Sequence, residues 1–439
     1  MRLFNTLCTR RGSSRQIPWA IVLILALAAG ILVSSAQAET LGVAPDGIGW
    51  LEGFPGGYRV LHLKGDHYQM GLQHGYLMAT EIQEHIQAYV YDYAIFDHGM
   101  TLAQIMDIWN SAEPFIPQRF KDELQGVADA SGVDLGELQA MNILPMRYHC
   151  SGIAVWGRCT RLLGNGPVHQ TRSLDYDLEI GHTVHPQDNA LIILREPESY
   201  IASVSPLWSG FIGTVGGMNA EGIAVSEMGS GCSDESYHGL PMTVRLIRVL
   251  EEAKNLNEAV SIMTESNGTC GFNFLVTSGF EQDGRAIELT HTLSSVSAPE
   301  DPVEDNGPHW PIEDALRRTN HFLDYTTAAT QRDEYGSLVN PKDGDYFSWV
   351  NYYVQSTWID SVAWFGGMNA YRCEMMMRRI YSLGDDIAKL VGESLPVMYQ
   401  AVFSPGLGKF RVAYAHGQVP AQRFPYFEYD LNQLLAAQP

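Results

Sequence analysis

The pattern of hydrophobic and polar positions changes near residue 149. Before that point apolar residues recur at helical spacing, which predicts helices over 68–90 and over 115–144, the second broken at Ser131 and Gly132. After it, apolar and polar residues alternate between glycine-rich turns, as in paired antiparallel strands. We therefore expect a mostly helical segment followed by a series of hairpins.

The expected strands share period-two alternation and turn residues at their ends. They cover 150–156, 168–174, 190–194, 200–204, 213–227, 273–290 and 397–415, and helices return at 242–255 and 371–390. Helices, then hairpin-rich strands, then helices predict a layered α/β protein with antiparallel sheets between helical layers.

The N-terminus predicts export. Four arginines precede an apolar run at 20–33, and Ala36 and Ala38 form a cleavage signal before Glu39. A run of that length is shorter than the roughly 20 residues of a membrane span but suits a signal peptide. We expect residues 1–38 to be removed, leaving a periplasmic or secreted protein (lysosomal in a eukaryote) with no stable membrane span.

Composition narrows the function. The chain has 439 residues, 45% of them hydrophobic and 18% charged, which excludes a disordered chain. Asp plus Glu outnumber Lys plus Arg by 50 to 28, and the net charge of −22 argues against a nucleic-acid partner. The zinc-protease, phosphate-loop and serine-hydrolase signatures are missing from the sequence, so we expect neither a metal nor a cofactor.

Cysteine counting points to one unusual thiol. Once Cys8 leaves with the signal peptide, five cysteines remain, and an odd number in an exported protein leaves at least one unpaired. We expect two disulfides and one free thiol. The five are Cys150, Cys159, Cys232, Cys270 and Cys373.

Cys150 is the candidate nucleophile. It begins the first predicted hairpin, whose returning strand carries Arg172 and Asp175. A nucleophilic cysteine needs a base and a cationic or donor-rich setting that favours its thiolate, and such a hairpin brings both charges back to the thiol. On spacing alone, a disulfide-bonded Cys150 with a surface ion pair between Arg172 and Asp175 is about equally favoured.

The sequence around Cys150, Arg172 and Asp175 resembles that of a known family. Cys150-Ser-Gly-Ile-Ala-Val-Trp-Gly with Arg172-Ser-Leu-Asp175-Tyr is similar to the start of the mature chain in peptidase C45, the acyl-coenzyme A:6-aminopenicillanic acid acyltransferase family. These are N-terminal nucleophile hydrolases related to the choloylglycine hydrolases. Four further similar stretches occur in the expected order. They begin at Gly65, Gly217, Phe274 and Arg318.

The resemblance implies a four-layer αββα fold and a precursor that cleaves itself between His149 and Cys150. Residues 39–149 would then be a helical α chain or propeptide and 150–439 the catalytic chain. The implied activity is that of a cysteine N-terminal nucleophile hydrolase or acyltransferase acting on linear amide bonds of an N-acyl small molecule or lipid. It proceeds through an acyl-enzyme and without a cofactor.

The family's functional positions fall on four residues here. Cys150 takes the place of the nucleophile, Asp175 that of the carboxylate that binds the new N-terminus, and Asn320 that of the oxyanion donor. Arg172 matches an arginine of the choloylglycine hydrolases. Asp175 lies 25 positions after Cys150, more than is usual in the family. A late arginine of the acyltransferases is replaced by Ser394.

Three alternatives remain open at this point. Cys159 rivals Cys150, because Cys159-Thr160 resembles the Cys-Thr start of many relatives. The substrate class can also be a lipid, as in phospholipase B-like proteins or acid ceramidase. A third alternative is a non-catalytic binding relative, which the presence of Arg172, Asp175 and Asn320 disfavours.

Overall fold

The structure is a computed structural model whose chain divides into two units, Met1–Ala38 and Glu39–Pro439. The predicted signal peptide and Ser394 both lie outside the residues that the structure describes. The described residues are 38–144, 149–305, 309–332, 347–388 and 396–439.

The larger sheet has ten strands in the order β1-β2-β3-β6-β7-β8-β9-β10-β11-β12. Neighbouring strands pair antiparallel except β3 and β6, which are parallel. Its strands are β1 (Glu39–Val43), β2 (Trp50–Gly53), β3 (Arg59–Gly65), β6 (Leu191–Pro197), β7 (Ser203–Leu207), β8 (Gly216–Asn219), β9 (Ile223–Gly229), β10 (Phe272–Ser278), β11 (Asp283–Leu289) and β12 (Ser294–Ser297).

The smaller sheet is antiparallel, with the order β13-β4-β5-β14-β15-β16. The predicted hairpin of Cys150 lies inside this sheet, since β4 pairs with β13 and β5 pairs with β14. Its strands are β4 (His149–Val155), β5 (His169–Asp175), β13 (Ala315–Arg318), β14 (Val397–Ser404), β15 (Lys409–Tyr414) and β16 (Phe427–Asp430).

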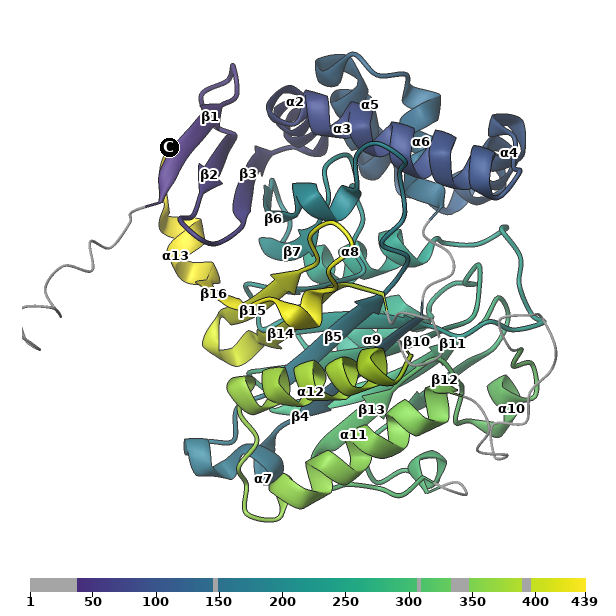
Figure 1. The fold of residues 1–439 in the computed structure, drawn as a ribbon, viewed down its shortest axis with the longest axis vertical. Coiled ribbons are helices and arrows are strands. Elements are labelled where there is room, and N and C mark those ends of the chain that lie inside the picture. The colour runs from purple at the N-terminus through teal and green to yellow at the C-terminus, as the bar shows by residue number, and fades with distance from the viewer. Residues whose placement is uncertain (1–37, 145–148, 306–308, 333–346, 389–395) are drawn as a thin grey trace, which may run out of the picture. The chain divides into compact units, whose positions relative to one another are not determined.

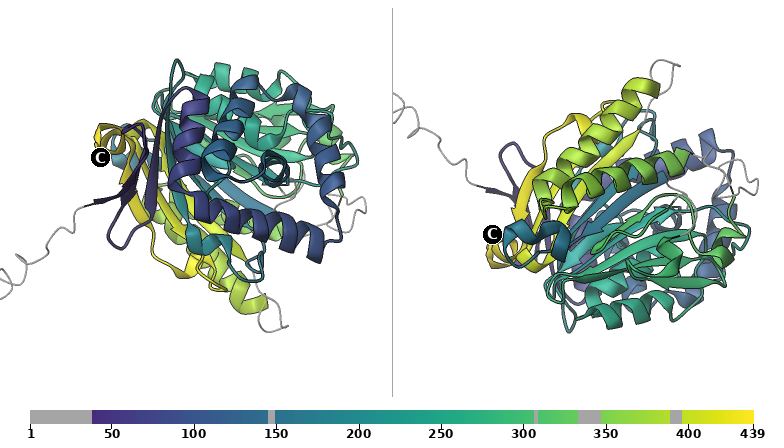
Figure 2. Two further views of the ribbon diagram at one scale, coloured as in Figure 1. Left: turned by 90° about the horizontal axis from the view of Figure 1, so that it is seen from above. Right: turned by 90° about the horizontal axis from the view of Figure 1, so that it is seen from below.

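The two sheets stack face to face between two helical layers, as predicted. β4 packs on β9 across the interface, α12 (Ala370–Ala388) covers β5 and β14, and α11 (Phe347–Ala363) covers β13. On the other side α8 (Met242–Glu252) and α9 (Leu256–Thr264) cover the larger sheet. In the right view of Figure 2, light-green α11 and α12 lie on one side of the sheets and teal helices on the other. The fold is therefore α/β with αββα layers.

A second group of helices comes from the segment before Cys150 and is labelled in Figure 1. α2 packs against β3 and lies along α5. Its members are α2 (His67–Leu77), α3 (Ala79–Ile86), a π-helix (Gln87–Asp97), α4 (Leu102–Ala112), α5 (Gln118–Ser131) and α6 (Leu135–Ile143). The short helices α7 (Gly157–Thr160), α10 (Tyr325–Ala328) and α13 (Leu431–Ala436) lie elsewhere.

Two local predictions differ from the structure. The helix expected over 68–90 is divided at Met78 into α2 and α3 and continues as the π-helix. The segment expected to be mostly helical begins with β1, β2 and β3. These strands are short, and β3 finds its parallel partner β6 only after the whole helical group. Local alternation carries little information about such a pairing.

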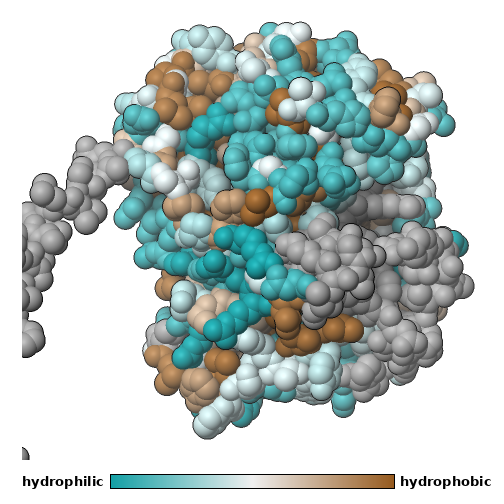
Figure 3. All heavy atoms as spheres, in the orientation of Figure 1, coloured by the Kyte–Doolittle hydropathy of each residue, from teal (hydrophilic) through white to brown (hydrophobic). Residues whose placement is uncertain are grey.

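The surface is mixed. On the face seen in Figure 3, hydrophobic residues form separate patches among hydrophilic ones, as on many globular proteins. Within the described part of the chain, no helix combines the length and the apolar character that crossing a membrane requires.

Candidate active site

The register of β4 and β5 sets the orientation of the candidate site. Cys150 lies opposite Leu174, and His149 lies opposite Asp175. Because side chains alternate between the two faces of a sheet, Cys150 and Arg172 point toward the larger sheet, whereas Asp175 points toward α12. The two charged residues predicted on the returning strand therefore lie on opposite faces.

A buried ion pair lies beside the thiol. Glu227 of β9 approaches from the larger sheet, with its Oε1 3.9 Å from the Sγ of Cys150. Nη2 of Arg172 donates to the same oxygen at 2.5 Å, and the side chains of both charged residues are fully buried. The sheet interface thus brings one cation and one carboxylate to the thiol.

Burial has the largest effect on the pKa values of the Cys150 thiol and the Glu227 carboxyl. It raises the pKa of the Cys150 thiol well above its ordinary value, although the charge of Arg172 opposes the change. Burial also raises the pKa of Glu227 to about 7, again against Arg172. In the intact chain the thiol is therefore protonated, and a nucleophilic role requires a base close by.

Glu227 is the residue that sequence reasoning missed. Its second oxygen, Oε2, is buried and finds no hydrogen-bond partner among the described residues. The signal was a carboxylate in a strand, 223–229, that is buried throughout. Buried carboxylates are rare unless they are paired, so a glutamate in a strand with this much apolar sequence predicts a charged partner.

Asn320 connects the two sheets at the backbone of Cys150. Its Oδ1 accepts a hydrogen bond from the Cys150 nitrogen at 3.0 Å, and its Nδ2 donates to the carbonyl of Gly229 at 2.7 Å. Asn320 follows β13, the neighbour of β4, and its own backbone nitrogen donates to Ser348 Oγ at 2.7 Å. Cys150, Arg172 and Asn320, predicted from distant motifs, are therefore brought together.

Asp175 occupies a separate hydrogen-bond network. Its carboxylate accepts hydrogen bonds from the hydroxyls of Tyr381 at 2.7 Å and Ser173 at 2.8 Å. The Tyr381 oxygen also lies 2.6 Å from Ser151 Oγ. Burial raises the pKa of Asp175 to about 7, although these two donors oppose the rise. In the intact chain Asp175 thus anchors α12 to β5.

Cys159 lies in a different environment. Its Sγ donates to the carbonyl of Glu313 at 3.3 Å, and burial raises its pKa to about 12. It belongs to a second apolar cluster that contains Ile153, Val155 and Cys373. The Arg172–Glu227 pair and Asn320 surround Cys150 instead, and the geometry favours Cys150 over Cys159.

The expected disulfides do not form in the structure. Among the described residues the five cysteines are all buried and none is joined to another by a disulfide. Sγ of Cys159 donates to a backbone carbonyl, as does Sγ of Cys232, to Asp234 at 3.4 Å. A buried thiol can be satisfied by such contacts and by apolar packing. The cysteine count therefore did not require the two disulfides that we expected.

The described residues also contain no group of three or more His, Cys, Asp or Glu side chains arranged to hold a metal ion. His67 and His74, two histidines of α2 seven residues apart, form hydrogen bonds with other protein groups. Nε2 of His67 lies 3.1 Å from Oε1 of Glu251, and Nε2 of His74 accepts from the Gly210 nitrogen at 2.9 Å.

Comparison with protein families identifies part of the chain. Residues 183–365 match the sequence model of the family described as "AAT: Acyl-coenzyme A:6-aminopenicillanic acid acyl-transferase". The matched region holds Glu227 and Asn320. Over these residues the match agrees with the family that the motifs resembled, and Cys150, Arg172 and Asp175 lie before it.

Three relatives among curated proteins are distant. Protein dcd1B of Dictyostelium discoideum is 26% identical over 277 residues, covering 57% of this chain and 54% of the relative. An uncharacterized protein of Archaeoglobus fulgidus is 24% identical, covering 62% of this chain and 49% of the relative. Protein dcd1A of D. discoideum is 22% identical, covering 53% of this chain and 58% of the relative. The chain thus spans about half the length of the curated relatives it matches.

Solved structures also show likenesses. A conjugated bile acid hydrolase from Clostridium perfringens has a TM-score of 0.40 and 10% identity, covering 65% of this chain and 93% of that chain. A Caenorhabditis elegans N-acylethanolamine-hydrolyzing acid amidase ortholog has a TM-score of 0.37 and 14% identity, covering 59% of this chain and 94% of that chain. A penicillin V acylase from Agrobacterium tumefaciens has a TM-score of 0.39 and 12% identity, covering 65% of this chain and 87% of that chain. The αββα layers of this chain are inferred from its own strand order and helix packing.

Proposed function

We propose, from the match of residues 183–365 to the acyl-coenzyme A:6-aminopenicillanic acid acyl-transferase family, that this chain transfers or hydrolyses the acyl group of linear N-acyl amides through an acyl-enzyme on Cys150. The observation that carries the proposal is the convergence of Arg172, Glu227 and Asn320 on the Cys150 thiol and its backbone nitrogen. A buried thiol beside a fixed cation and a proton acceptor suits nucleophilic catalysis.

Autoproteolysis is the first step of the proposal. Sγ of Cys150 attacks the carbonyl carbon of His149, and the thiol proton passes to Glu227, whose Oε1 lies 3.9 Å away. The carbon–nitrogen bond of the peptide then breaks, and the nitrogen takes that proton and leaves as an amine. Water hydrolyses the resulting thioester. With its pKa near 7, Glu227 supports this role, because it can accept and return a proton near neutral pH.

The amine released by cleavage is the proposed base for turnover. An ordinary α-amine has a pKa of about 7.7–8.0 and a thiol about 8.5, so the amine can accept the thiol proton near neutral pH. The thiolate attacks the substrate carbonyl, and the leaving amine takes the proton from the Cys150 ammonium. Water or a second amine then takes the acyl group from sulfur, which completes hydrolysis or transfer.

Asn320 and Asp175 have proposed supporting roles. Nδ2 of Asn320, which binds Gly229 in the intact chain, would donate to the oxyanion of the tetrahedral intermediate; such a donor typically contributes about 3–4 kcal/mol. Cleavage would disconnect Cys150 from His149, the residue opposite Asp175, and create the new amine one position along β4 from that carboxylate. Asp175 would then orient the amine.

The purified chain tests this proposal directly. We expect two pieces on a denaturing gel, the second with Cys150 at its N-terminus by sequencing. Cys150→Ala is expected to stay intact and inactive, whereas the matched variant Cys159→Ala is expected to cleave. Fully active enzyme that retains an intact 149–150 peptide bond would contradict the proposal.

The substrate class is tested with the cleaved enzyme. A panel of N-acyl amides, N-acyl homoserine lactones, phospholipids and β-lactams is expected to show turnover of the linear amides first. Preference for the phospholipid esters would favour a lipid acyl hydrolase instead. A lack of any hyper-reactive thiol toward an acyl-type electrophile would favour a binding protein.

Export is a further part of the proposal. It is supported by the apolar run at 20–33 and by the small residues Ala36 and Ala38 before Glu39. Expression in a host with a secretory pathway is expected to yield an extracytoplasmic protein whose first residue is Glu39. A cytoplasmic protein that retains Met1 would contradict it.

A further inference from the structure

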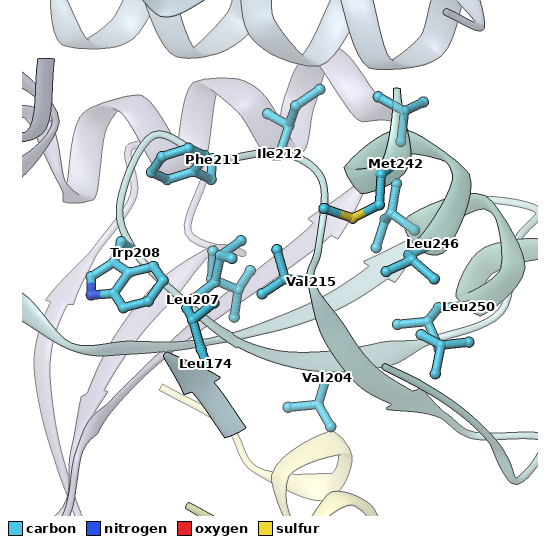
Figure 4. Packing of buried hydrophobic residues seen from close by; sticks show 14 of the residues in the cluster. Leu174, Val204, Leu207, Trp208, Phe211, Ile212, Val215, Met242, Leu246 and Leu250 are labelled. Carbon is cyan, nitrogen blue, oxygen red and sulfur yellow. The ribbon is translucent and has the colours of Figure 1, made fainter. Parts of the chain in front are cut away.

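The hairpin of β4 and β5 has an apolar and a polar face near the proposed cleavage point. Leu174 of β5 packs among buried apolar residues such as Leu207 and Val215 (Figure 4). Because side chains alternate along a strand, its neighbours Ser173 and Asp175 face the other way, toward α12. The polar side chains of β5 that lie closest to the cleavage point are therefore on the α12 side.

One hydroxyl group connects four elements on that side. Oη of Tyr381, in α12, donates to Oδ2 of Asp175 at 2.7 Å and lies 2.6 Å from Oγ of Ser151 in β4. It also accepts a hydrogen bond from Nδ2 of Asn351 in α11 at 3.2 Å. An ionised carboxylate only accepts hydrogen bonds, so the Tyr381 proton points to Asp175 and Ser151 is the donor to Tyr381. A chain of hydrogen bonds thus runs from Ser151 through Tyr381 to Asp175.

The second oxygen of the Asp175 carboxylate is held as well. Oγ of Ser173 donates to Oδ1 at 2.8 Å, and it accepts a hydrogen bond from Nε2 of Gln400 at 3.1 Å. Oη of Tyr426 donates in turn to Oε1 of Gln400 at 2.9 Å. The side chains of Ser173 and Tyr381 are buried. The orientation of the carboxylate is therefore fixed before any cleavage takes place.

Cleavage at 149–150 would turn the start of β4 into a chain end, and chain ends fray unless they are tied down. Two hydrogen bonds hold this end. The Cys150 nitrogen donates to Asn320, and the side chain of the next residue, Ser151, contacts Tyr381. The Tyr381 hydroxyl therefore holds both the residue beside the new amine and the carboxylate of Asp175.

Resting on the proposed acyl-enzyme function, we propose that Tyr381 is a positioning residue for the α-amine of Cys150. Its hydroxyl ties Ser151 to Asp175, so that the amine stays next to the thiol whose proton it accepts. Tyr381 acts through these two side chains and not on the substrate. The arrangement makes α12 a part of the catalytic apparatus, although α12 lies on the face of the smaller sheet opposite the thiol.

The pKa of the thiol is expected to report this arrangement. A cation within about 4–6 Å lowers the pKa of a thiol by about 1–3 units, and in the cleaved chain that cation would be the Cys150 ammonium beside Asp175. Tyr381→Phe keeps the ring but removes the tie between Ser151 and Asp175. The ammonium is then held less closely, and the pKa of the thiol rises.

Alkylation of Cys150 by iodoacetamide measures this pKa without an amide substrate. The rate is followed from pH 5 to 9 in the cleaved protein with both pieces present, on the peptide that begins at Cys150. We expect the rising limb of Tyr381→Phe to lie about one pH unit above that of the wild type. Tyr426→Phe is the matched control, because its hydroxyl reaches Asp175 only through Gln400 and Ser173. It is expected to keep the wild-type limb.

Turnover of an N-acyl amide gives a second measurement. Below the limb, a shift of one pH unit corresponds to a tenfold loss of the reactive form, so we expect kcat of Tyr381→Phe to fall about tenfold. KM is expected to stay within about twofold, because Tyr381 does not bind the substrate. A loss in KM alone would contradict a positioning role.

Ser151→Ala removes the other end of the tie and covers the case in which Tyr381→Phe does not fold or cleave. We expect its alkylation limb to move in the same direction. Wild-type limbs in both variants, or an equal shift in Tyr426→Phe, would overturn the inference and leave the proposed function intact. A shifted limb in a protein that turns over no amide would support the inference and contradict the proposed function, whereas an uncleaved wild-type chain would contradict both.

Discussion

At the residue scale, burial and two charged neighbours control the protonation of the Cys150 thiol. Cys150, Arg172 and Glu227 are fully buried, so solvent screens their interactions little. Arg172 favours the thiolate, whereas burial and Glu227 disfavour it. The thiol therefore stays protonated until a specific base removes the proton.

The role of Glu227 before cleavage predicts a pH dependence. As the pH rises through about 7, Glu227 loses its proton and becomes able to accept that of the thiol, so the cleavage rate of the wild-type precursor is expected to rise over this range. Glu227→Gln is expected to cleave about 100-fold more slowly and to lack this limb. Precursor refolded from urea and followed on gels from pH 5 to 9 provides the measurement, with exposed Glu221→Gln of the same hairpin as control. Wild-type kinetics in Glu227→Gln would rule out the role.

Asp175 predicts a second pH effect, on stability. Its pKa is raised to about 7 in the folded chain, so the folded state binds a proton more tightly than the unfolded state. The contribution of Asp175 to the free energy of unfolding is therefore complete below about pH 4, and it is lost as the pH rises to about 7. In a Cys150→Ala background, Asp175→Asn is expected to gain about 2–4 kcal/mol over its parent between pH 4 and 8, because each pKa unit corresponds to about 1.4 kcal/mol. Urea unfolding measures it; a pH-independent difference would contradict it.

Asp175 also has a predicted effect on turnover. In cleaved enzyme, Asp175→Asn keeps much of the hydrogen bonding and is expected to lower kcat modestly. Asp175→Ala is expected to raise the activation barrier by about 2–4 kcal/mol, comparable with the loss of an oxyanion donor. Steady-state kinetics on an N-acyl amide measures both. Near-wild-type activity in a cleaved Asp175→Ala protein would refute the role and point to Asp177.

At the element scale, the motif that begins at Gly65 is explained by the crossing of α2 and α5. A Cβ on Gly71 would lie 2.2 Å from the carbonyl oxygen of Glu123, and one on Gly126 would lie 2.3 Å from that of Tyr68. Asp66 caps α2 in a capping box with Gln69. The motif is therefore a packing device that places α2 against its partner helix.

This crossing predicts a cost for one added methyl group. Gly71→Ala is expected to lower the free energy of unfolding by about 1–3 kcal/mol, because overpacking exceeds the gain in helix propensity. Gly231→Ala is the control, since its nearest neighbour would be the Arg332 oxygen at 3.8 Å. Urea unfolding of both variants in a Cys150→Ala background gives the comparison. Equal stability of the two variants would show that the helices adjust freely.

At the scale of the whole molecule, the segment before Cys150 is integrated with the rest. β3 pairs with β6 along seven register positions. Behind these strands, Arg195 of β6 binds both carboxylate oxygens of Glu123 of α5, and it lies 3.5 Å from Glu251 of α8. His67 of α2 binds the same Glu251. These contacts do not depend on the peptide bond at 149–150.

We therefore predict that residues 39–149 stay bound after cleavage. The two pieces are expected to co-elute in size exclusion even in 1 M salt, because buried pairs are screened little. Arg195→Ala leaves the buried carboxylate of Glu123 without its cation, typically at a cost of about 3–5 kcal/mol, and is expected to release the smaller piece. Lys64→Ala removes an exposed pair with Glu196 between the same two strands and is the matched control. Free wild-type 39–149 segment would contradict the prediction.

The sequence by itself determined most of the local structure, and it predicted a chemical class for the site. Alternation and glycine turns located the hairpin of β4 and β5 and the strands β9, β10 and β14, because periodicity and turn chemistry act over a few residues. The motif around Cys150 and the segment at Asn320 predicted a family whose sequence model matches residues 183–365 of this chain.

Only the tertiary structure decided which distant groups meet. Glu227 reaches the thiol because β9 stacks on β4, and the parallel pair of β3 and β6 forms across the intervening helices. The same stacking decides that the face of β5 with Arg172 meets the larger sheet, whereas the face with Asp175 meets α12. These contacts are chosen by the burial of apolar surface between layers and by the pairing of charges that burial requires. Both are sums over elements far apart in the chain, which no local pattern records.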